Sequence, residues 1–378
     1  MAPLHRALAC ACLVSAATGL AQLGGGTRLG QLVAAKHQEV QRLVKLSEEG
    51  DGFAGAEAEG EGFLEVDKLA MRLGYAAGRS SLRVTRALRR DALSARRGEE
   101  HLVAVAADIK RASPTSEALP RGVASFGDAA DVAVAAAQWG ADVVFVNTDA
   151  QGWGGDVDEL QRACERLKPR KVPAPSPEEA DAAEARHAAA EDDGGAGAAP
   201  VRRHPDDPQP GRPPVVMKDL IVHPLQIALA VERGAAGVYL MACVCGPDLE
   251  GLLNTATVLG TEAIVEVHTP QELEYAVHQA GATIVAVNRY DRTDGTLHPN
   301  QALALRADIP PNVVTLACGA MLPEDAFRHA DAGYDAVVLG RGLAVPGQDP
   351  SKSIREIRGR VSPALTAFDM GMGLPGMM

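Results

Sequence analysis

The sequence predicts an α/β fold, specifically a (β/α)8 TIM barrel with an amino-terminal helical extension. From residue 101 onward, eight short apolar runs alternate with Ala- and Leu-rich helical stretches, which is the pattern of successive βα units. The composition agrees, because 46% hydrophobic residues with 3% aromatics and 39 Gly suit parallel strands built from small and β-branched side chains. A doubly wound sheet would need fewer strands and a Gly-rich phosphate fingerprint after the first one, and the sequence has no such fingerprint.

The apolar runs share a repeated boundary with the helices before them. Four segments end a helix with Gly and enter a strand two to four residues later: W-G-A-D-V-V-F-V, R-G-A-A-G-V-Y-L, A-G-A-T-I-V-A-V and A-G-Y-D-A-V-V-L. This weak repeat is expected of consecutive βα units. The predicted strands cover residues 102–107, 142–146, 215–217, 237–241, 263–267, 283–287, 313–316 and 336–339.

Residues 1–25 are predicted to be a leader or targeting segment. Arg6 precedes an apolar stretch over 7–21 that is short for a bilayer span and ends in small residues. No Asp or Glu occurs before Glu39, as in a transit region. These features are typical of a secretory leader with a transit region behind it, and we expect no membrane attachment of the mature form.

Residues 26–100 are predicted to form the helical extension. Apolar spacing indicates an amphipathic helix over 29–46, the Gly-, Ala- and Glu-rich stretch 50–62 indicates a flexible linker, and a second helix is expected over 80–95. Seven arginines fall within 79–97, and we interpret them as a solvated helix face. The net charge of -12 argues against nucleic-acid binding, because neutralising phosphates requires clustered Lys and Arg.

The barrel itself is expected over residues 101–360, followed by a flexible tail at 361–378. Residues 169–214 interrupt it, since they are rich in Pro, Ala, Glu and Asp and too poor in apolar residues to offset their ordering entropy. We predict a disordered insertion there. Because it connects a helix to the third strand, it would lie at the amino-terminal face of the barrel, away from the chemistry.

Four of the apolar runs end on, or just beside, a residue that can do chemistry: Lys110, Lys218, Glu266 and Asn288. The carboxyl ends of barrel strands converge at one mouth, so these residues predict a single site. Two neighbouring lysines depress each other's pKa, which suits anion binding or proton donation near neutral pH. Glu266 would then supply the counter-charge and a proton acceptor, and Asn288 would hold a substrate hydroxyl or carbonyl.

Structural roles remain open for the same residues. Lys218 could form an ion pair with the adjacent Asp219, Glu266 could cap a loop, and Asn288 could satisfy a turn. His268, two residues beyond Glu266, is interpreted as structural.

The last two predicted strands end differently, in T-L-A-C-G and V-V-L-G-R-G. Glycines there let backbone N–H groups approach a ligand, and helix amino termini beyond them favour an anion. We therefore predict a phosphate site that includes Cys318, Gly319, Gly340, Arg341 and Gly342, and a small-molecule phosphorylated substrate. The six cysteines include no C-x-x-C, so we expect no metal and no cofactor.

Five segments resemble the indole-3-glycerol phosphate synthase family of tryptophan biosynthesis: A-A-D-I-K-R-A-S-P-T-S, N-T-D-A-Q-G-W-G-G-D-V-D-E-L, V-M-K-D-L-I-V-H-P-L-Q-I, A-I-V-E-V-H-T-P-Q-E-L and V-A-V-N-R-Y-D. The resemblance covers residues 28–360 apart from the insertion. It implies a carboxy-lyase reaction, the closure of 1-(2-carboxyphenylamino)-1-deoxyribulose 5-phosphate to indole-3-glycerol phosphate with loss of carbon dioxide and water. We also expect association with other enzymes of tryptophan biosynthesis. Because a leader suits a step of this pathway that has moved into an organelle, the resemblance favours import into a plastid (chloroplast), with a secretory route as the alternative.

The resemblance assigns a role to each candidate residue. Lys218 would be the general acid, Lys110 would hold the substrate carboxylate and assist dehydration, and Glu266 would stabilise the iminium charge or move protons. Asn288 would orient the substrate. Ser113, Gly319, Gly340 and Gly342 would form the phosphate cradle. The helix at 29–46 resembles the segment that covers the barrel mouth in the family.

The chain departs from the family pattern at several positions. Asp108 stands in place of a catalytic glutamate, Ala317 replaces the glutamate of E-S-G, Glu117 ends the loop where the family has a lysine-containing S-P-S-K-G, and Tyr290 replaces the arginine of N-N-R or N-S-R. Three functions therefore remain open: a divergent working synthase, a pseudoenzyme barrel acting as a binding or scaffold subunit, and another phosphate-binding barrel with an altered substrate.

Overall fold

The computed structural model describes residues 26–48, 82–90, 103–114, 122–170, 209–344 and 349–358. Several predictions fall on other residues. The leader, the linker, the tail and the interior of the insertion lie outside the described part of the chain.

Eight parallel strands close into one barrel in sequence order, each hydrogen-bonded to the next and β8 to β1, so the predicted TIM-barrel fold is confirmed. The strands are β1 (Ala104–Ile109), β2 (Val143–Asn147), β3 (Val215–Lys218), β4 (Gly237–Met241), β5 (Glu262–Val267), β6 (Ile284–Asn288), β7 (Val314–Cys318) and β8 (Ala336–Leu339). Strands β1 and β7 each run two residues further than predicted. They do so because Asp108 and Cys318 are buried and paired inside the barrel, so the polar residue does not end the strand.

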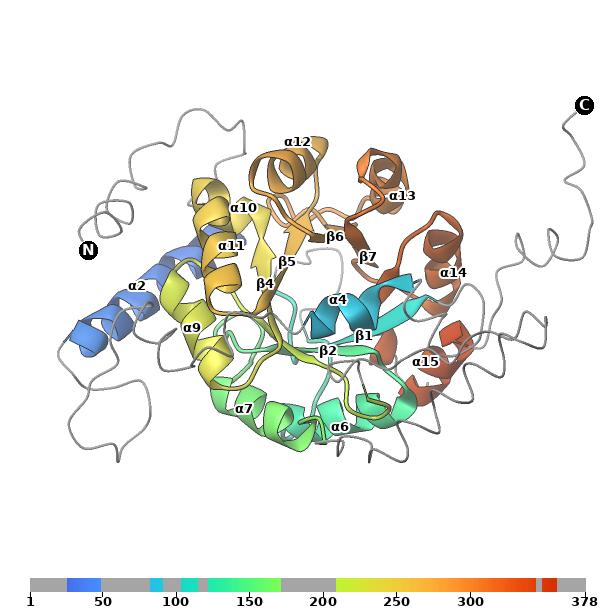
Figure 1. Cartoon of the computed structure of the whole chain (residues 1–378), viewed down its shortest axis with the longest axis horizontal. Helices are drawn as coiled ribbons and strands as arrows, with labels where there is room; N and C mark the ends of the chain where they lie inside the picture. The colour runs from blue at the N-terminus through green and yellow to red at the C-terminus, as the bar shows by residue number, and fades with distance from the viewer. Residues whose placement is uncertain are drawn as a thin grey trace, which may run out of the picture.

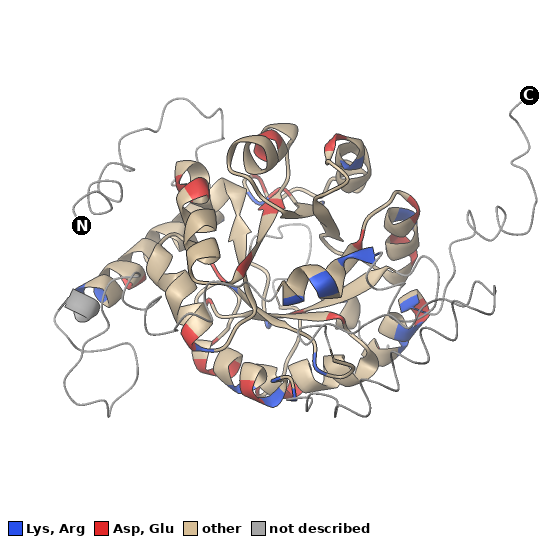
Figure 2. Ribbon diagram, viewed as in Figure 1, with Lys and Arg blue, Asp and Glu red and all other residues tan. Residues whose placement is uncertain are grey.

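Helices surround the barrel (Figure 1). They are α2 (Arg28–Glu48), α4 (Arg83–Leu88), α6 (Ala129–Trp139), α7 (Val157–Arg166), α9 (Pro224–Glu232), α10 (Ala242–Cys245), α11 (Leu249–Val258), α12 (Pro270–Glu274), α13 (Gln301–Leu305), α14 (Pro323–Asp331) and α15 (Pro350–Arg358). Single helical turns occur at Gly246–Asp248, Tyr275–Gln279, Arg306–Asp308 and Arg341–Leu343. Figure 2 shows acidic and basic residues scattered over the surrounding helices, and no described helix is long and apolar enough to cross a membrane.

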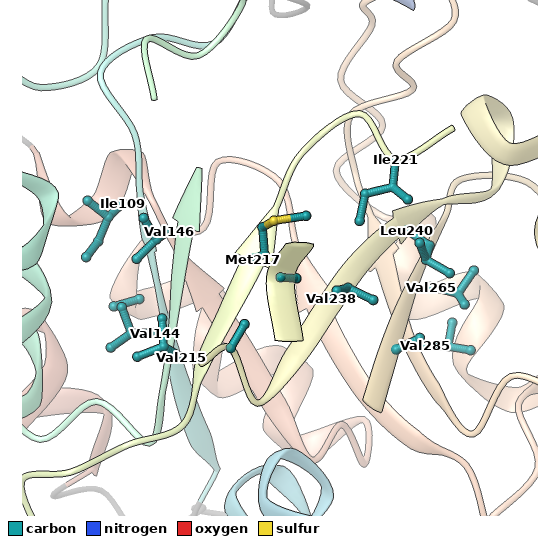
Figure 3. Close-up of a cluster of buried hydrophobic side chains, with 14 of the residues drawn as sticks. Ile109, Val144, Val146, Val215, Met217, Ile221, Val238, Leu240, Val265 and Val285 are labelled. Carbon is teal, nitrogen blue, oxygen red and sulfur yellow. The ribbon is translucent and has the colours of Figure 1, made fainter. Parts of the chain in front are cut away.

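Alternation along the strands divides the core into two layers. Side chains of one parity, such as Val144, Met217 and Val265, pack between the strands and the helices (Figure 3). Those of the other parity, such as Phe145 and Leu316, fill the barrel interior. Successive strand residues face opposite sides, and therefore parity decides which polar residues can reach the inside of the barrel.

Helix α4 closes the amino-terminal end of the barrel. Val84, Ala87 and Leu88 are fully buried against the interior cluster. The backbone N–H groups of Val84 and Thr85 donate to the carboxylate of Glu262, the first residue of β5, at 2.6 and 2.9 Å. A carboxylate at a helix amino terminus satisfies donors that the helix itself cannot pair.

The prediction that the arginines form a solvated helix face was wrong for Arg89 and Arg90. The helix ends at Leu88 because Arg89 adopts extended backbone, which is earlier than predicted. Arg89 then donates to the carbonyl of Asn312 at 2.8 Å and Arg90 to that of Ala330 at 2.7 Å. These two arginines therefore attach the extension to the floor of the barrel.

Helix α2 covers part of the opposite end. Lys36 is 2% exposed, and its ammonium lies 3.0 Å from carboxylate oxygens of Asp149 and Asp219, which follow β2 and β3. Burial alone would lower the pKa of Lys36, but these carboxylates outweigh it and raise the pKa. Asp219 thus pairs with Lys36 and Thr148, which leaves Lys218 to another partner.

The two ends of the predicted insertion are ordered. Gln209 exchanges hydrogen bonds with the backbone of Arg170 at 2.9 and 2.7 Å, and Arg212 donates to the carbonyl of Lys168. Residues 169–170 and 209–214 of the predicted insertion are therefore held by hydrogen bonds before the chain enters β3, and disorder of the residues between them stays a prediction.

Candidate active site

A polar pocket opens at the carboxyl ends of the strands. Its volume is about 460 Å³, including space that is open to solvent. It is lined by Asp108, Lys110, Ser113, Lys218, Glu266, Asn288, Tyr290, Arg292, Cys318, Gly319, Ala320, Val338, Gly340 and Arg341. Ten of the residues predicted from the sequence thus meet in one cavity, and Gly342 does not line it.

Strand parity explains why these side chains meet. Lys218, Glu266, Asn288 and Cys318 occupy the positions of their strands that face the barrel interior, in step with interior residues such as Leu316. Because the strands are parallel, their carboxyl ends lie at one end of the barrel. The carboxyl ends of these four strands therefore form one site.

Asp108 joins the two lysines. Its Oδ2 accepts a hydrogen bond from Lys110 and lies 3.2 Å from Nζ of Lys218, and its Oδ1 accepts from the Asn147 amide at 2.9 Å. The counter-charge of the lysines is thus Asp108. The prediction that Glu266 supplies it was wrong, because Glu266 is held by other cations.

The electrostatics of this cluster follow from burial and close opposite charge. Burial alone would raise the pKa of Asp108, but Lys110 and Lys218 outweigh it and hold that pKa below its ordinary value. Burial lowers the pKa of Lys110, Asp108 opposes this, and the neighbouring Lys218 adds to it. Asp108 is therefore a carboxylate, and Lys110 gives up its proton more readily than an ordinary lysine.

Lys218 also faces two aromatic rings. Its Nζ lies 4.4 Å from the ring centroid of Tyr239 and 5.7 Å from that of Phe145. An ammonium over a ring face is attracted by the quadrupole of the ring. With Asp108 on one side and Tyr239 on the other, the 3% exposed Lys218 has a fixed position in the pocket wall.

Glu266 is fully buried among several donors. Arg292 donates to both of its oxygens, the Tyr239 hydroxyl donates to Oε2 at 2.7 Å, and His268 Nε2 lies 3.2 Å from Oε1. Burial alone would raise the pKa of Glu266, but Arg292 and His268 lower it well below the ordinary value. Glu266 is therefore a permanent negative charge and a weak proton acceptor, unlike the base suggested by the sequence.

Two groups of side chains have a spacing that could hold a metal ion. The possible ligand atoms of Cys243, His268 and Glu272 lie within 4.8 Å of one another, as do those of Asp291, Asp294 and His298. In the first set both ring nitrogens of His268 already contact carboxylates. Burial would lower the pKa of His268, but Cys243 and the two glutamates raise it well above its usual value, so a metal at this set would have to displace a proton. Cys243 itself lies in helix α10.

The turn after β7 presents backbone to the pocket. Gly319 and Ala320 both have positive φ, 96° and 49°, and a side chain at Gly319 would lie 2.4 Å from Oδ1 of Asn288. Arg289 donates to the carbonyls of Gly319 and Ala320 at 2.8 and 2.9 Å. A non-glycine residue in this region is strained, and Arg289 holds the strained turn in place.

Asn288 and Cys318 support the same turn. Oδ1 of Asn288 accepts from the backbone N–H of Tyr290 at 2.9 Å, so the amide satisfies a turn while also lining the pocket. The Cys318 thiol lies 3.5 Å from the carbonyl of Val287, and burial raises its pKa to about 11. Cys318 is therefore a neutral thiol.

The residues after β8 have different roles. A Cβ atom at Gly340 would lie 3.1 Å from Oδ2 of Asp108 and 3.2 Å from Nζ of Lys110, so a side chain there would push the ends of these two side chains away by a few tenths of an ångström. A side chain at Gly342 would lie 2.5 Å from the Met321 carbonyl. Gly342 thus packs against the loop after β7 and does not line the pocket, and its place in the phosphate cradle stays a prediction.

Sequence reasoning missed Arg292, Tyr239 and the role of His268 in holding Glu266. Arg292 lies four residues beyond a strand end, where a loop residue gives no periodic signal. Tyr239 is followed by two more apolar strand residues, so it read as ordinary core. Its shared parity with Lys218, its register partner, was the available signal.

Comparison with known proteins identifies the family of this chain. The family model for indole-3-glycerol phosphate synthase matches residues 209–357. The protein of that name from Mycobacterium sp. (strain KMS) is 32% identical over 259 residues, which cover 68% of this chain and 76% of the relative. The chain belongs to the indole-3-glycerol phosphate synthase family.

The chain is also similar to a second curated relative and to a solved structure. The indole-3-glycerol phosphate synthase of Rhodococcus opacus (strain B4) is 28% identical over 68% of this chain and 77% of its own length. Among solved structures, 3-hexulose-6-phosphate synthase from Salmonella typhimurium matches with a TM-score of 0.45 and 13% identity, over 68% of this chain and 97% of that one.

Besides Asp108, two departures from the indole-3-glycerol phosphate synthase pattern can be located in the structure. Ala317 belongs to the layer between strands and helices and does not line the pocket. Arg292 lies two residues beyond Tyr290, the position where the sequence lacks the expected arginine, and its guanidinium lies in the pocket against Glu266. The remaining departure, at Thr115 to Glu117, lies outside the described residues.

Proposed function

We propose that this pocket closes 1-(2-carboxyphenylamino)-1-deoxyribulose 5-phosphate to indole-3-glycerol phosphate, releasing carbon dioxide and water. One observation supports this most directly: two lysines share the carboxylate of Asp108 in a pocket that also contains a buried carboxylate, Glu266, and the glycine turn after β7. The substrate carries a carboxylate, a carbonyl and a phosphate, and each has a matching group in the pocket.

Lys218 is the general acid in this proposal. It donates a proton to the ribulose carbonyl oxygen as the aromatic ring carbon that bears the carboxylate attacks the carbonyl carbon. The new carbon–carbon bond leaves a positive charge shared by the ring and its nitrogen. Lys218 suits this step because Asp108 and the Tyr239 ring hold it in place, and a fixed acid needs little reorganisation in the transition state.

The positive intermediate is stabilised by Glu266, whose lowered pKa keeps it ionised. Carbon dioxide then leaves, and the electron pair of its bond returns to the ring. The hydroxyl formed from the carbonyl leaves as water after it takes a proton, and loss of a proton from the adjacent methylene carbon completes the indole. Lys110 holds the carboxylate first and supplies the proton for water loss, since its lowered pKa makes it a better donor than an ordinary lysine.

The phosphate occupies the side of the pocket formed by the ends of β7 and β8 and by Ser113. Gly319 and Gly340 offer backbone approach there, and Arg341 adds a cationic side chain to the lining.

The test is the appearance of indole fluorescence when purified protein is mixed with the substrate. We expect turnover by the unaltered chain and a loss of about 10²–10⁴-fold in kcat for Lys218→Ala, the range of general acid catalysis. Lys352→Ala, which alters an exposed lysine on α15, is the matched control and should leave kcat unchanged.

Complementation of a tryptophan auxotroph gives an independent answer in the cell. Growth that depends on Lys218 supports the synthase. Substrate binding without turnover above the Lys218→Ala background would instead support a scaffold barrel, and binding of other sugar phosphates alone would support a barrel with an altered substrate.

A further inference from the structure

Tyr239 contacts two residues of opposite charge that line the pocket, Lys218 and Glu266. The face of its ring lies 4.4 Å from the ammonium of Lys218, and its hydroxyl donates to Oε2 of Glu266 at 2.7 Å. Tyr239 is fully buried and is the register partner of Lys218 on the neighbouring strand. One side chain thus contacts both the proposed acid and the proposed carboxylate.

This arrangement has a physical consequence for the two charges. Lysine and glutamate side chains are long and flexible, and in a buried pocket they attract each other strongly. Among the described residues, Lys218 pairs with Asp108 and Glu266 pairs with Arg292 and His268. Tyr239 contacts Lys218 with the face of its ring and Glu266 with its hydroxyl, while each of the two charges keeps its own ionic partner.

Neighbouring contacts fix the position of this ring. It packs against Phe145 with centroids 5.4 Å apart, and its hydroxyl lies 3.7 Å from the Cys318 thiol. Burial raises the pKa of Tyr239, and Cys318 and Glu266 add to the rise, so the hydroxyl remains a neutral donor. A rigid aromatic with a hydroxyl at its tip can hold a cation on its face and an anion at its end.

We propose that Tyr239 is a positioning residue of the reaction: its ring keeps Lys218 directed at the substrate carbonyl, and its hydroxyl keeps Glu266 directed at the positive intermediate. This inference rests on the proposed function. Tyr239 acts through Lys218 and Glu266, and its loss should lower kcat more than it changes KM.

The first experiment compares Tyr239→Phe with Tyr239→Leu. The phenylalanine variant keeps the ring and loses one hydrogen bond to a charged group, so kcat should fall by about ten-fold while KM changes little. The leucine variant also loses the ring contact with Lys218, and its kcat should fall further. In a Glu266→Gln background, Tyr239→Phe should add no further loss, because the hydroxyl acts through that carboxylate.

Tyr334→Phe is the matched control. Tyr334 is equally buried, and its hydroxyl donates at 2.5 Å to the Ala302 carbonyl in the outer layer. Its variant should lose thermal stability with kcat unchanged. If Tyr239→Phe likewise loses only stability, or if kcat and KM change together, Tyr239 is merely structural and the proposal is wrong.

A second measurement requires no turnover and leaves the shape of the tyrosine side chain nearly unchanged. With 3-fluorotyrosine placed at position 239, the ¹⁹F resonance should shift in Lys218→Met and in Glu266→Gln, but not in Lys352→Met. It should also shift when a reduced substrate analogue, with an alcohol in place of the carbonyl, binds. Absence of turnover by the unaltered chain would overturn the proposed function alone, whereas an unchanged resonance in both pocket variants would overturn the role of Tyr239.

Discussion

Two glutamates on the same strand show how differently the two ends of the barrel treat a buried carboxylate. Glu262 begins β5 at the floor and Glu266 lies four residues later at the mouth, and both are buried. Glu262 accepts from two neutral backbone N–H groups of α4, whereas Glu266 contacts a guanidinium and an imidazole. Neutral donors satisfy the lone pairs of the carboxylate, but only cations offset the loss of hydration of its charge.

The pKa values of the two residues move in opposite directions. Burial raises the pKa of Glu262, and its hydrogen bonds only partly oppose this. At Glu266 the nearby cations outweigh burial and lower the pKa. The floor therefore uses a carboxylate to attach a helix, and the mouth keeps one ionised for chemistry.

The largest expected effect is a difference in kcat between variants of the two glutamates. Glu266→Gln removes the charge that faces the intermediate and should lower kcat by about 10²–10³-fold, as when one electrostatic contact to a transition state is lost. Glu262→Gln should leave kcat unchanged. Steady-state kinetics on both variants, with thermal unfolding to confirm folding, makes the comparison. Equal losses of kcat would show that both glutamates act through the fold.

A substitution at the floor of the barrel should lower the free energy of unfolding strongly and leave kcat unchanged. Leu88→Ala on α4 empties a fully buried position, and we expect a loss of about 2–5 kcal/mol in the free energy of unfolding. Denaturant titration measures it. Unchanged kcat in the folded variant would establish that the floor only supports the barrel, and a parallel fall of kcat would show that the two ends are coupled.

The smallest expected effect is a difference in pH dependence. The ordinary glutamate pKa is 4.5. Because the folded pKa of Glu262 lies above it, the contribution of Glu262 to stability is full below pH 4.5 and declines as pH rises through the folded value. Because that of Glu266 lies below it, its contribution is full above pH 4.5 and declines as pH falls.

The measurement is the unfolding free energy of each Gln variant, subtracted from that of the unaltered chain at several pH values. The difference should decrease with rising pH for Glu262→Gln and increase for Glu266→Gln. Slopes of the same sign would mean that hydrogen bonding, and not nearby charge, decides both pKa values.

Prediction from the sequence succeeded where a periodic signal exists. The strand endings at Lys110, Lys218 and Glu266 could be read because an ionisable residue interrupts an apolar run. Prediction failed where the partner comes from elsewhere in the chain. The pairing of Asp108 with both lysines, the contact of Arg292 with Glu266, and the packing of Gly342 on Met321 depend on distances between different βα units.

By itself the sequence determined the barrel, the end of it that carries chemistry, and the family resemblance, because alternation and strand order are local properties of the chain. Only the tertiary structure decided which charges are neighbours, because strand register and loop conformation set those distances. Tyr239 illustrates the difference, since in the sequence it is one apolar residue among several in a strand. In the folded barrel it contacts both the ammonium of Lys218 and the carboxylate of Glu266.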